Sequence, residues 1–268
     1  MLSYRHGKSF ESMSTNDSRY VFLTVRTSST RLSRKCFLPF GDSTVLGHVI
    51  SRSLNFNFIP IVCTSDDPSD DEIEEYCNRL GINCFRGSLG NKLLRWHKCA
   101  EIHQVSAFHT VDVDDPFFDP TQVIESLSLL DQENLDVVYP TEISASGSAS
   151  VGYSISSKYL ANLLPTFEEL KELEMVDIVF NNFAATRSKV LFSKVQDARN
   201  LRLTLDYAED YWLLCFILRM VGPFCAREQI IELFAKNPDL YLINWFRNHE
   251  WADKQMKSRF QTQESIGE

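Results

Sequence analysis

The sequence predicts an α/β protein with a mostly parallel central sheet flanked by helices. Short runs of β-branched and aromatic residues alternate with segments of helical periodicity for about 120 residues after Tyr20. The strand-length runs are continuously apolar, as in strands that are buried on both faces. Right-handed crossovers join such strands, and ligands bind beyond the carboxyl ends of the strands.

The first half of the chain supplies the elements of this alternation in order. Each predicted helix has apolar residues at intervals of three and four, and each predicted strand is a short apolar run. Acidic residues begin one of the helices and Gly81 follows its end, as helix termini prefer. The expected order is strand Tyr20–Val25, helix Val45–Leu54, strand Ile59–Cys63, helix Asp70–Leu80, strand Asn83–Phe85, helix Lys92–Ile102, strand Phe108–Val113 and a helix from Pro120.

The second half of the chain is less regular. We interpret residues 1–19 as a flexible tail, residues 20–250 as a single domain and residues 251–268 as a C-terminal tail. The expected elements are the strands Val137–Tyr139 and Val151–Ile155, a polar loop Thr141–Ser150, a helical segment Phe167–Phe183, a strand Arg202–Leu205, the helix Glu209–Met220 and two short helices within Glu228–Phe246.

The composition argues against several classes of protein. A net charge of −9 argues against nucleic-acid binding. No apolar run approaches the roughly 18–20 residues that span a bilayer, and Met1–Arg19 lacks the apolar core of a signal peptide. Seven cysteines without a C-x-x-C pair indicate free thiols in a reducing compartment rather than disulfides or a zinc site. We therefore expect a cytoplasmic protein with neither a nucleic-acid nor a membrane partner.

The loop after the first strand, Arg26–Lys35, is locally basic in an acidic chain. It carries four positive residues and no acid. A triphosphate needs cations and N–H donors in a concave turn, and the small residues Thr27–Thr30 let the backbone approach phosphate closely. No G-K-[S/T] sequence occurs in it, so it is not a Walker loop. The alternative interpretation is a solvated basic loop.

Carboxylates follow the strand Phe108–Val113. Asp112 and Asp114 would face the same side of an extended segment, because the side-chain period of a strand is two. Carboxylates at a strand end can hold Mg²⁺ against phosphate oxygens. The alternative is a polar turn that caps the helix from Pro120.

A third group lies near the C-terminus, where Asp206 follows the short strand Arg202–Leu205 and precedes an apolar helix. By itself Asp206 would be interpreted as a helix N-cap. If its strand lies beside the strand that leads to Asp114, Asp206 becomes a second metal ligand.

These three groups together resemble the cytidylyltransferase family that makes CMP-activated sugar acids, and most closely its branch for spore-coat polysaccharide synthesis. The similarity spans about residues 20 to 245, and Ser28 and Ser33 replace a Gly and a Pro of the family's first loop. The family patterns are A-R-x-G-S-x-R-L-P-x-K at Val25–Lys35, G-D-x-P-x-x-D-P at Val113–Pro120 and R-L-T-x-D-x-x-E-D at Arg202–Asp210, with shorter matches at Thr64–Asp67, Phe85–Ser88, Leu94–Arg95, Lys236–Pro238 and Ile243–Asn244.

The resemblance implies a Rossmann-like nucleotide-diphospho-sugar transferase fold and a reaction in which CTP and a small anionic acceptor give a CMP-linked product and pyrophosphate. It also implies a homodimer, with residues of about 140–200 serving the acceptor and the dimer contact. The implied site consists of catalytic Arg26, Arg31 and Lys35 on the β- and γ-phosphates, further nucleotide contacts from Val25, Ser28, Ser29, Ser65 and Asp112, and Asp114 and Asp206 as ligands of Mg²⁺. Arg86 and Arg95 are candidate acceptor contacts, with ordinary salt bridges as the alternative.

Two other functions stay open from the sequence. Asp112-Val113-Asp114 spells the D-x-D motif of metal-dependent glycosyltransferases, but such enzymes do not need a basic loop after the first strand. The Ser28 and Ser33 departures allow a catalytically silent nucleotide-binding protein, because Gly permits backbone conformations that Ser seldom adopts. The histidines His97, His103 and His109 have no matching acid–nucleophile arrangement, and we interpret them as structural.

Overall fold

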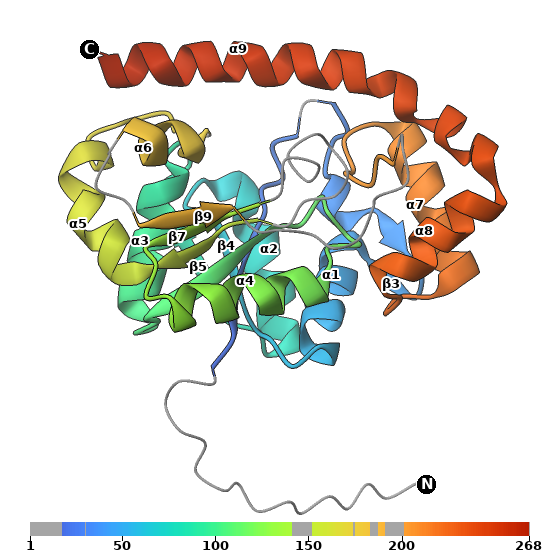
Figure 1. The fold of residues 1–268 in the computed structure, drawn as a ribbon, viewed down its shortest axis with the longest axis horizontal. Coiled ribbons are helices and arrows are strands. Elements are labelled where there is room, and N and C mark those ends of the chain that lie inside the picture. Colours follow the sequence, from blue (N-terminus) through green and yellow to red (C-terminus); the bar gives the residue numbers. More distant parts are fainter. Residues whose placement is uncertain are drawn as a thin grey trace, which may run out of the picture.

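A mostly parallel sheet of seven strands forms the centre of the part of the chain that the structure describes (Figure 1). The computed structural model describes residues 18–29, 31–140, 152–173, 175–182, 187–190 and 201–267. The strand order is β5-β4-β1-β6-β8-β7-β9, in which β5, β4, β1 and β6 are parallel and β8 is antiparallel to both of its neighbours. The strands are β1 Tyr20–Thr24, β4 Ile59–Ser65, β5 Cys84–Gly87, β6 Ala107–Asp112, β7 Val137–Tyr139, β8 Ser154–Ser156 and β9 Ser188–Val190.

Helices pack against both faces of the sheet, and the C-terminal part of the chain is largely helical. They are α1 Val45–Asn55, α2 Asp71–Leu80, α3 Lys92–Ile102, α4 Pro120–Gln132, α5 Ser157–Phe167, α6 Val176–Asn182, α7 Ala208–Val221, α8 Arg227–Lys236 and α9 Asn248–Gly267. Shorter elements are the 3₁₀ turns η1 Lys35–Phe37, η2 Pro68–Asp70, η4 Pro238–Ile243 and η5 Trp245–Arg247, and a hairpin of β2 Pro39–Phe40 and β3 Ser43–Thr44.

The strands are apolar on both faces because each face has its own core. Side chains of β1 alternate across the sheet. Val21 and Leu23 pack in a core with residues of α1, α7 and α8, whereas Phe22 packs on the opposite face with residues of α3, α5 and α6. Phe22 also stacks on Phe108 of β6, with ring centroids 4.0 Å apart. This two-sided burial holds the central strands rigidly in register.

Short polar residues fix where the helices begin. Thr44 Oγ1 accepts a hydrogen bond from the N–H of Gly47 at 3.1 Å, and Asn91 Oδ1 accepts one from Leu94 at 2.9 Å. The helix after β6 has the same device, since its N-cap Asp119 accepts from Thr121 and Pro120 occupies the first turn. Both α3 and α4 therefore begin at defined points beyond the carboxyl ends of strands.

The strand register brings distant segments to one edge of the sheet. Thr24, the last residue of β1, pairs with Asp112, the last residue of β6. The extended segment 201–206 joins the same edge, because the N–H of Leu205 donates to the carbonyl of Asp114 at 2.7 Å. The predicted α/β fold with a mostly parallel sheet is confirmed, and its strand ends converge as expected.

Parts of the second half of the chain differ from the sequence interpretation. Helix α5 was not expected, although Tyr159, Leu160 and Leu163 follow helical spacing. The predicted helix Phe167–Phe183 instead contains the last residue of α5 and the separate helix α6. Strand β9 has only three residues, all of them exposed, so it carries no apolar pattern. The predicted strand 202–205 is not among the strands of the sheet. The predicted tail 1–19 and loop Thr141–Ser150 lie almost wholly outside the described residues.

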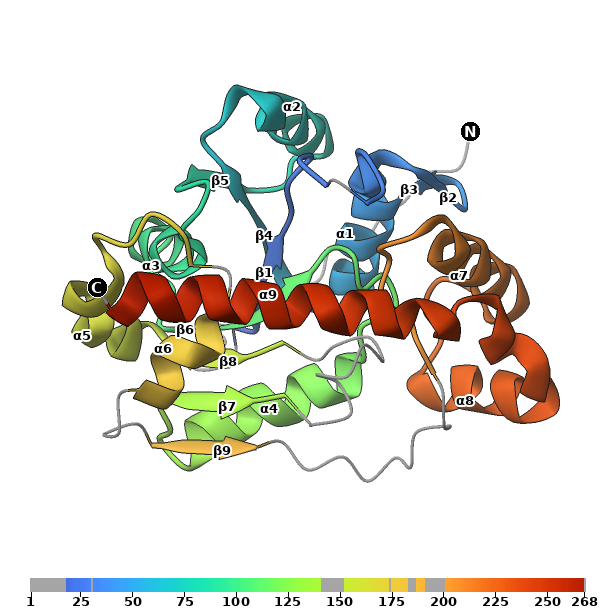
Figure 2. The ribbon, with the colours of Figure 1, turned by 90° about the horizontal axis from the view of Figure 1, so that it is seen from above.

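Residues 251–267 of the predicted C-terminal tail 251–268 belong to helix α9. Viewed from above, α9 crosses over the carboxyl-terminal edge of the sheet (Figure 2). The helix lacks an apolar stripe, which is why the sequence resembles a tail, and charged contacts hold it. Arg247, just before α9, pairs with Glu209 at 2.8 Å, and Arg259 pairs with Asp177 of α6 at 2.6 Å. None of the described helices combines the length and the apolar character that crossing a membrane would require.

Candidate active site

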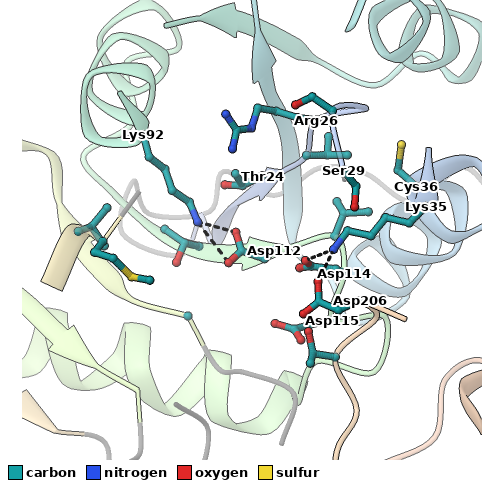
Figure 3. Close-up of a pocket in the computed structure, with 18 of the residues that line it drawn as sticks. Thr24, Arg26, Ser29, Lys35, Cys36, Lys92, Asp112, Asp114, Asp115 and Asp206 are labelled. Atoms are coloured by element: carbon teal, nitrogen blue, oxygen red, sulfur yellow. Dashed lines mark hydrogen bonds and ion pairs between the residues drawn. The ribbon is translucent and has the colours of Figure 1, made fainter. Parts of the chain in front are cut away.

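A cavity of about 710 Å³ lies at the carboxyl ends of β1 and β6. The basic loop (residues 26–35) forms one wall, and the turn after β6 and residues 204–206 form the floor beside it (Figure 3). Helices α3, α6 and α9 contribute further walls, together with residues near β8 such as Tyr153. The cavity is therefore built at the edge where open parallel sheets bind ligands.

Asp70 anchors the start of the basic loop. Its Oδ1 accepts hydrogen bonds from both the N–H and the hydroxyl of Thr27 at 2.8 Å, and its Oδ2 accepts one from the hydroxyl of Ser65. Burial disfavours the charged carboxylate, but the hydrogen bonds from Ser65 and Thr27 outweigh it and hold the pKa of Asp70 below its ordinary value. The loop is thus fixed to the end of β4 by one ionised side chain.

Lys35 joins the two predicted metal-binding aspartates. Its Nζ lies 2.6 Å from Asp114 Oδ2 and 2.9 Å from Asp206 Oδ1, and it also donates to the carbonyl of Leu205 at 2.9 Å (Figure 3). Arg31 from the same loop pairs with Asp206. Two cations of the basic loop therefore meet two carboxylates that come from different segments.

The electrostatics of this group depend on burial and pairing together. Burial by itself would lower the pKa of Lys35, but the carboxylates of Asp114 and Asp206 more than compensate and raise it above its ordinary value. The pKa of Asp206 is held below its ordinary value, because Lys35 and Arg31 outweigh the effect of burial. Beside them, burial and the neighbouring Asp114 and Asp112 raise the pKa of Asp115 well above its ordinary range.

A buried ion pair behind the cavity sets the position of Asp206. Arg202 and Asp210 are both 0 % exposed, and their bidentate contacts measure 2.9 and 3.0 Å. Asp210 Oδ2 also accepts the backbone N–H groups of Asp206 at 2.9 Å and Tyr207 at 3.0 Å. Asn244 closes the group by donating to Asp210 Oδ1 at 2.9 Å. The Arg202–Asp210 motif is thus one ion-pair frame that presents a single carboxylate, Asp206, to the cavity.

A second ion pair lies on the other side of the cavity, and sequence reasoning missed it. Lys92 Nζ lies 2.9 and 3.2 Å from the two carboxylate oxygens of Asp112, and it lies 5.2 Å from the ring centroid of Trp96 (Figure 3). Trp96 Nε1 donates to Thr24 Oγ1 at 3.0 Å. The sequence could have indicated Lys92 by its position, because it is the first residue of a helix that follows the carboxyl end of a strand, where ligands bind.

Most of the predicted site residues line the cavity. They are Val25, Arg26, Ser28, Ser29, Arg31, Lys35, Arg95, Asp112, Asp114 and Asp206.

Ser65 and Arg86 do not line the cavity. The hydroxyl of Ser65 donates a hydrogen bond to Asp70 instead. Arg86 pairs with Asp71 at 2.6 Å and with Glu74 at 3.2 Å, and it donates to the carbonyls of Ser65 and Asp67. Arg86 therefore forms ordinary salt bridges, as the alternative interpretation has it, and does not face the cavity.

Comparisons with known proteins assign the chain to a family. Residues 21–239 match the family model described as Cytidylyltransferase. The chain belongs to the cytidylyltransferase family. It is 28 % identical over 240 residues to the spore coat polysaccharide biosynthesis protein SpsF of Bacillus subtilis, a match that covers 84 % of this chain and 96 % of that protein.

Solved structures show the same fold. A cytidylyltransferase from Leptospira borgpetersenii superposes with a TM-score of 0.69 at 22 % identity, covering 84 % of this chain and 97 % of that one. A CMP:2-keto-3-deoxy-manno-octonic acid synthetase, solved in complex with CTP, superposes with a TM-score of 0.57 at 14 % identity, covering 75 % of this chain and 99 % of that one. The predicted nucleotidyltransferase fold and enzyme class are confirmed.

Family membership favours nucleotidyl transfer over the glycosyltransferase alternative for Asp112-Val113-Asp114. Asp112 and Asp114 also belong to two different ion pairs, with Lys92 and Lys35. The structural interpretation of His109 agrees with its surroundings: it is buried, its Nδ1 lies 2.8 Å from Ser154 Oγ, and burial lowers its pKa to about 3.

We expect Asp210→Ala to destabilise the fold by about 3–5 kcal/mol, because it leaves the buried guanidinium of Arg202 without its main counter-charge. Urea unfolding measures the change. The matched control is Glu232→Ala, which removes an exposed i,i+4 pair with Lys236 and should leave the unfolding midpoint unchanged. Equal midpoints for the two variants would contradict the role of Asp210 as a frame.

We expect the carboxylate of Asp70 to contribute a pH-dependent part of the stability. Its folded-state pKa lies below the ordinary value of 3.8, so its contribution is complete above that value and is lost as the pH falls through the lower folded-state pKa. Unfolding measured from about pH 6 to about pH 3 should therefore show a flatter acid limb for Asp70→Asn than for the wild type. The exposed Asp66→Asn in the same segment serves as the control, and an acid limb equally flattened in that variant would refute the assignment.

Proposed function

We propose that this enzyme transfers CMP from CTP to a small anionic acceptor and releases pyrophosphate, in the synthesis of a glycan or polysaccharide precursor. One observation carries the proposal: a basic loop and two carboxylates from distant segments meet across a single cavity at the edge of the sheet. The relative from Bacillus subtilis and the synthetase solved with CTP support the choice of nucleotide and product class.

The basic loop would hold the triphosphate. Arg26, Arg31 and Lys35 all line the cavity, and their charges suit the β- and γ-phosphates. Ser28, which replaces a Gly of the family pattern, is compatible with this role because it is not among the residues with positive φ. In this loop Arg34 has the left-handed conformation instead, with φ of 53°. The loop therefore reaches its turn without a glycine.

The donor set around Lys35 fits Mg²⁺. Asp114 Oδ2 and Asp206 Oδ1 both lie within hydrogen-bond distance of one ammonium group, so two carboxylate oxygens already converge on a single positive charge. Mg²⁺ is commonly bound by one or two carboxylates together with substrate phosphates. Held by Asp114 and Asp206, the ion would neutralise charge on the phosphate oxygens.

The chain's own residues then have distinct tasks in the transfer. The acceptor oxygen forms a bond to the α-phosphorus while the bond from phosphorus to the bridging oxygen breaks, and the electrons of that bond leave with pyrophosphate. Arg31 and Lys35 would stabilise the charge that develops on the leaving group. The Arg202–Asp210 frame would keep Asp206 in place throughout. The homodimer stays a prediction, since much of the segment 140–200 lies outside the described residues. The cytoplasmic location stays a prediction as well.

We expect Lys35→Ala to lower kcat/KM for CTP by about 100-fold or more, equivalent to roughly 3 kcal/mol of transition-state stabilisation. The matched control is Arg34→Gly, because Arg34 pairs with Glu72 outside the cavity and glycine tolerates its positive φ. That control should retain the wild-type rate. Equal rates for Lys35→Ala and Arg34→Gly would remove Lys35 from the mechanism.

We expect the purified enzyme to release pyrophosphate from CTP, in the presence of Mg²⁺, with at least one member of a panel of ulosonic acids, phosphosugars and phosphonates. Turnover with ATP, GTP or UTP under the same conditions should be much slower. Tight binding of CTP with no pyrophosphate from any acceptor would favour the catalytically silent alternative. Release of a nucleoside diphosphate from a nucleotide sugar would favour glycosyl transfer.

A further inference from the structure

Helix α9 forms a wall of the cavity that the family model does not include. The match to the family ends at residue 239, whereas α9 spans Asn248–Gly267. Figures 1 and 2 both show α9 passing over the carboxyl-terminal edge of the sheet, and four of its residues line the cavity: Trp251, Lys254, Lys257 and Arg259. The helix is thus an addition to the family core that meets the site directly.

Both ends of this stretch of α9 are held against the core. Near its beginning, Trp251 lies under the guanidinium of Arg202, 6.0 Å from the ring centroid, which places it beside the Asp206 frame. Eight residues later, Arg259 pairs with Asp177 of α6 at 2.6 Å. At 1.5 Å of rise per residue these two anchors are about 12 Å apart along the helix axis. Lys254 and Lys257 lie between them.

Spacing directs the two lysines to the same side. Trp251, Lys254 and Lys257 follow one another at intervals of three, so each is a neighbour of the next on the helix surface, and all three border the cavity. A surface helix normally turns apolar residues toward the body of the protein. Here Met256 and Phe260 are instead 54 % and 62 % exposed, and the inward face is basic.

The charges of the cavity distinguish Lys254 and Lys257 from the other cations. Arg31 and Lys35 are paired with the aspartates of the floor, Lys92 with Asp112, and Arg259 with Asp177. Within the described part of the chain, Lys254 and Lys257 have no ion-pair partner, although both border the cavity. Both side chains are exposed at the border of the cavity, and two neighbouring ammonium groups without a counter-charge attract an anion.

We propose that Lys254 and Lys257 form a subsite for the carboxylate or phosphate of the acceptor, an inference that rests on the proposed function. The triphosphate has its own cations on the basic loop, whereas α9 adds charge from the opposite side of the cavity. Between α9 and the sheet, Tyr153, Met175 and Val176 line the wall and offer an apolar surface to the carbon skeleton of an acceptor. Because α9 lies outside the family match, the choice of acceptor would depend on residues that the family model does not include.

Steady-state kinetics with an acidic acceptor from the panel above show whether the two lysines bind the acceptor or the triphosphate of CTP. The double variant Lys254→Ala/Lys257→Ala should raise the acceptor KM by about tenfold or more, and its KM for CTP should stay within about twofold. Lys236→Ala, which removes an exposed lysine of α8, is the matched control and should change neither constant. A raised KM for CTP with an unchanged acceptor KM would assign the lysines to the triphosphate and overturn the proposal.

Labelling with pyridoxal phosphate and borohydride tests the subsite without turnover, because this reagent is an anionic aldehyde that reacts with lysine amines. With CTP present, modification of Lys254 or Lys257, mapped by peptide mass spectrometry, should saturate with reagent concentration and be slowed by at least one acid of the panel. Lys236 should react linearly and without protection. Linear labelling at all three lysines, protection by CTP alone, or no protection by any acid would overturn the proposal. Calorimetry of CTP binding to the wild type is run in parallel. Absence of CTP binding there would show failure of the proposed function itself, separately from the labelling result.

Discussion

The site depends on a single ammonium group that balances two carboxylates. Lys35 contacts Asp114 and Asp206, which lie 79 and 171 residues away in the chain. Burying either carboxylate without a counter-charge would be costly, and like charges so close together would repel. The interaction with Lys35 therefore ties the basic loop, the turn after β6 and the segment 201–206 into one unit. A nucleotide that binds there meets these charged groups together in one cavity.

The rest of the architecture keeps those groups in place. Asp70 fixes the beginning of the basic loop to β4, and the Arg202–Asp210 pair fixes the backbone that carries Asp206. None of Asp70, Arg202 and Asp210 lines the cavity, so each acts by positioning other residues. In the Arg202–Asp210 motif, Asp206 faces the cavity, and the pair of Arg202 and Asp210 holds its backbone in place.

Sequence reasoning located the parts of the site that come from local patterns. The basic loop stands out by charge, and Asp114 and Asp206 follow apolar strands, so the topology of an α/β sheet brings them together. Arg86 illustrates the limit, because a cation near a strand end can equally pair with the next helix, here with Asp71 and Glu74. Lys92 and Asp112 could not be paired from sequence, since their contact depends on the exact rotation of α3.

Helix α9 escaped prediction for a related reason. Its sequence has no apolar stripe, and its position is set by long-range contacts such as Arg259 with Asp177. Periodicity detects helices that bury an apolar face, whereas α9 presents a basic face to a polar cavity. The cavity therefore combines residues inside the family match with a wall from α9, which lies beyond it.

A crystal structure with Mg²⁺ and a non-hydrolysable CTP analogue would test the central claim most directly. The account predicts that Lys35 Nζ moves from the two aspartates to the phosphates, and that the metal ion takes its place between Asp114 and Asp206. A bound nucleotide with Lys35 still joining both carboxylates, or a metal ion held elsewhere, would contradict it.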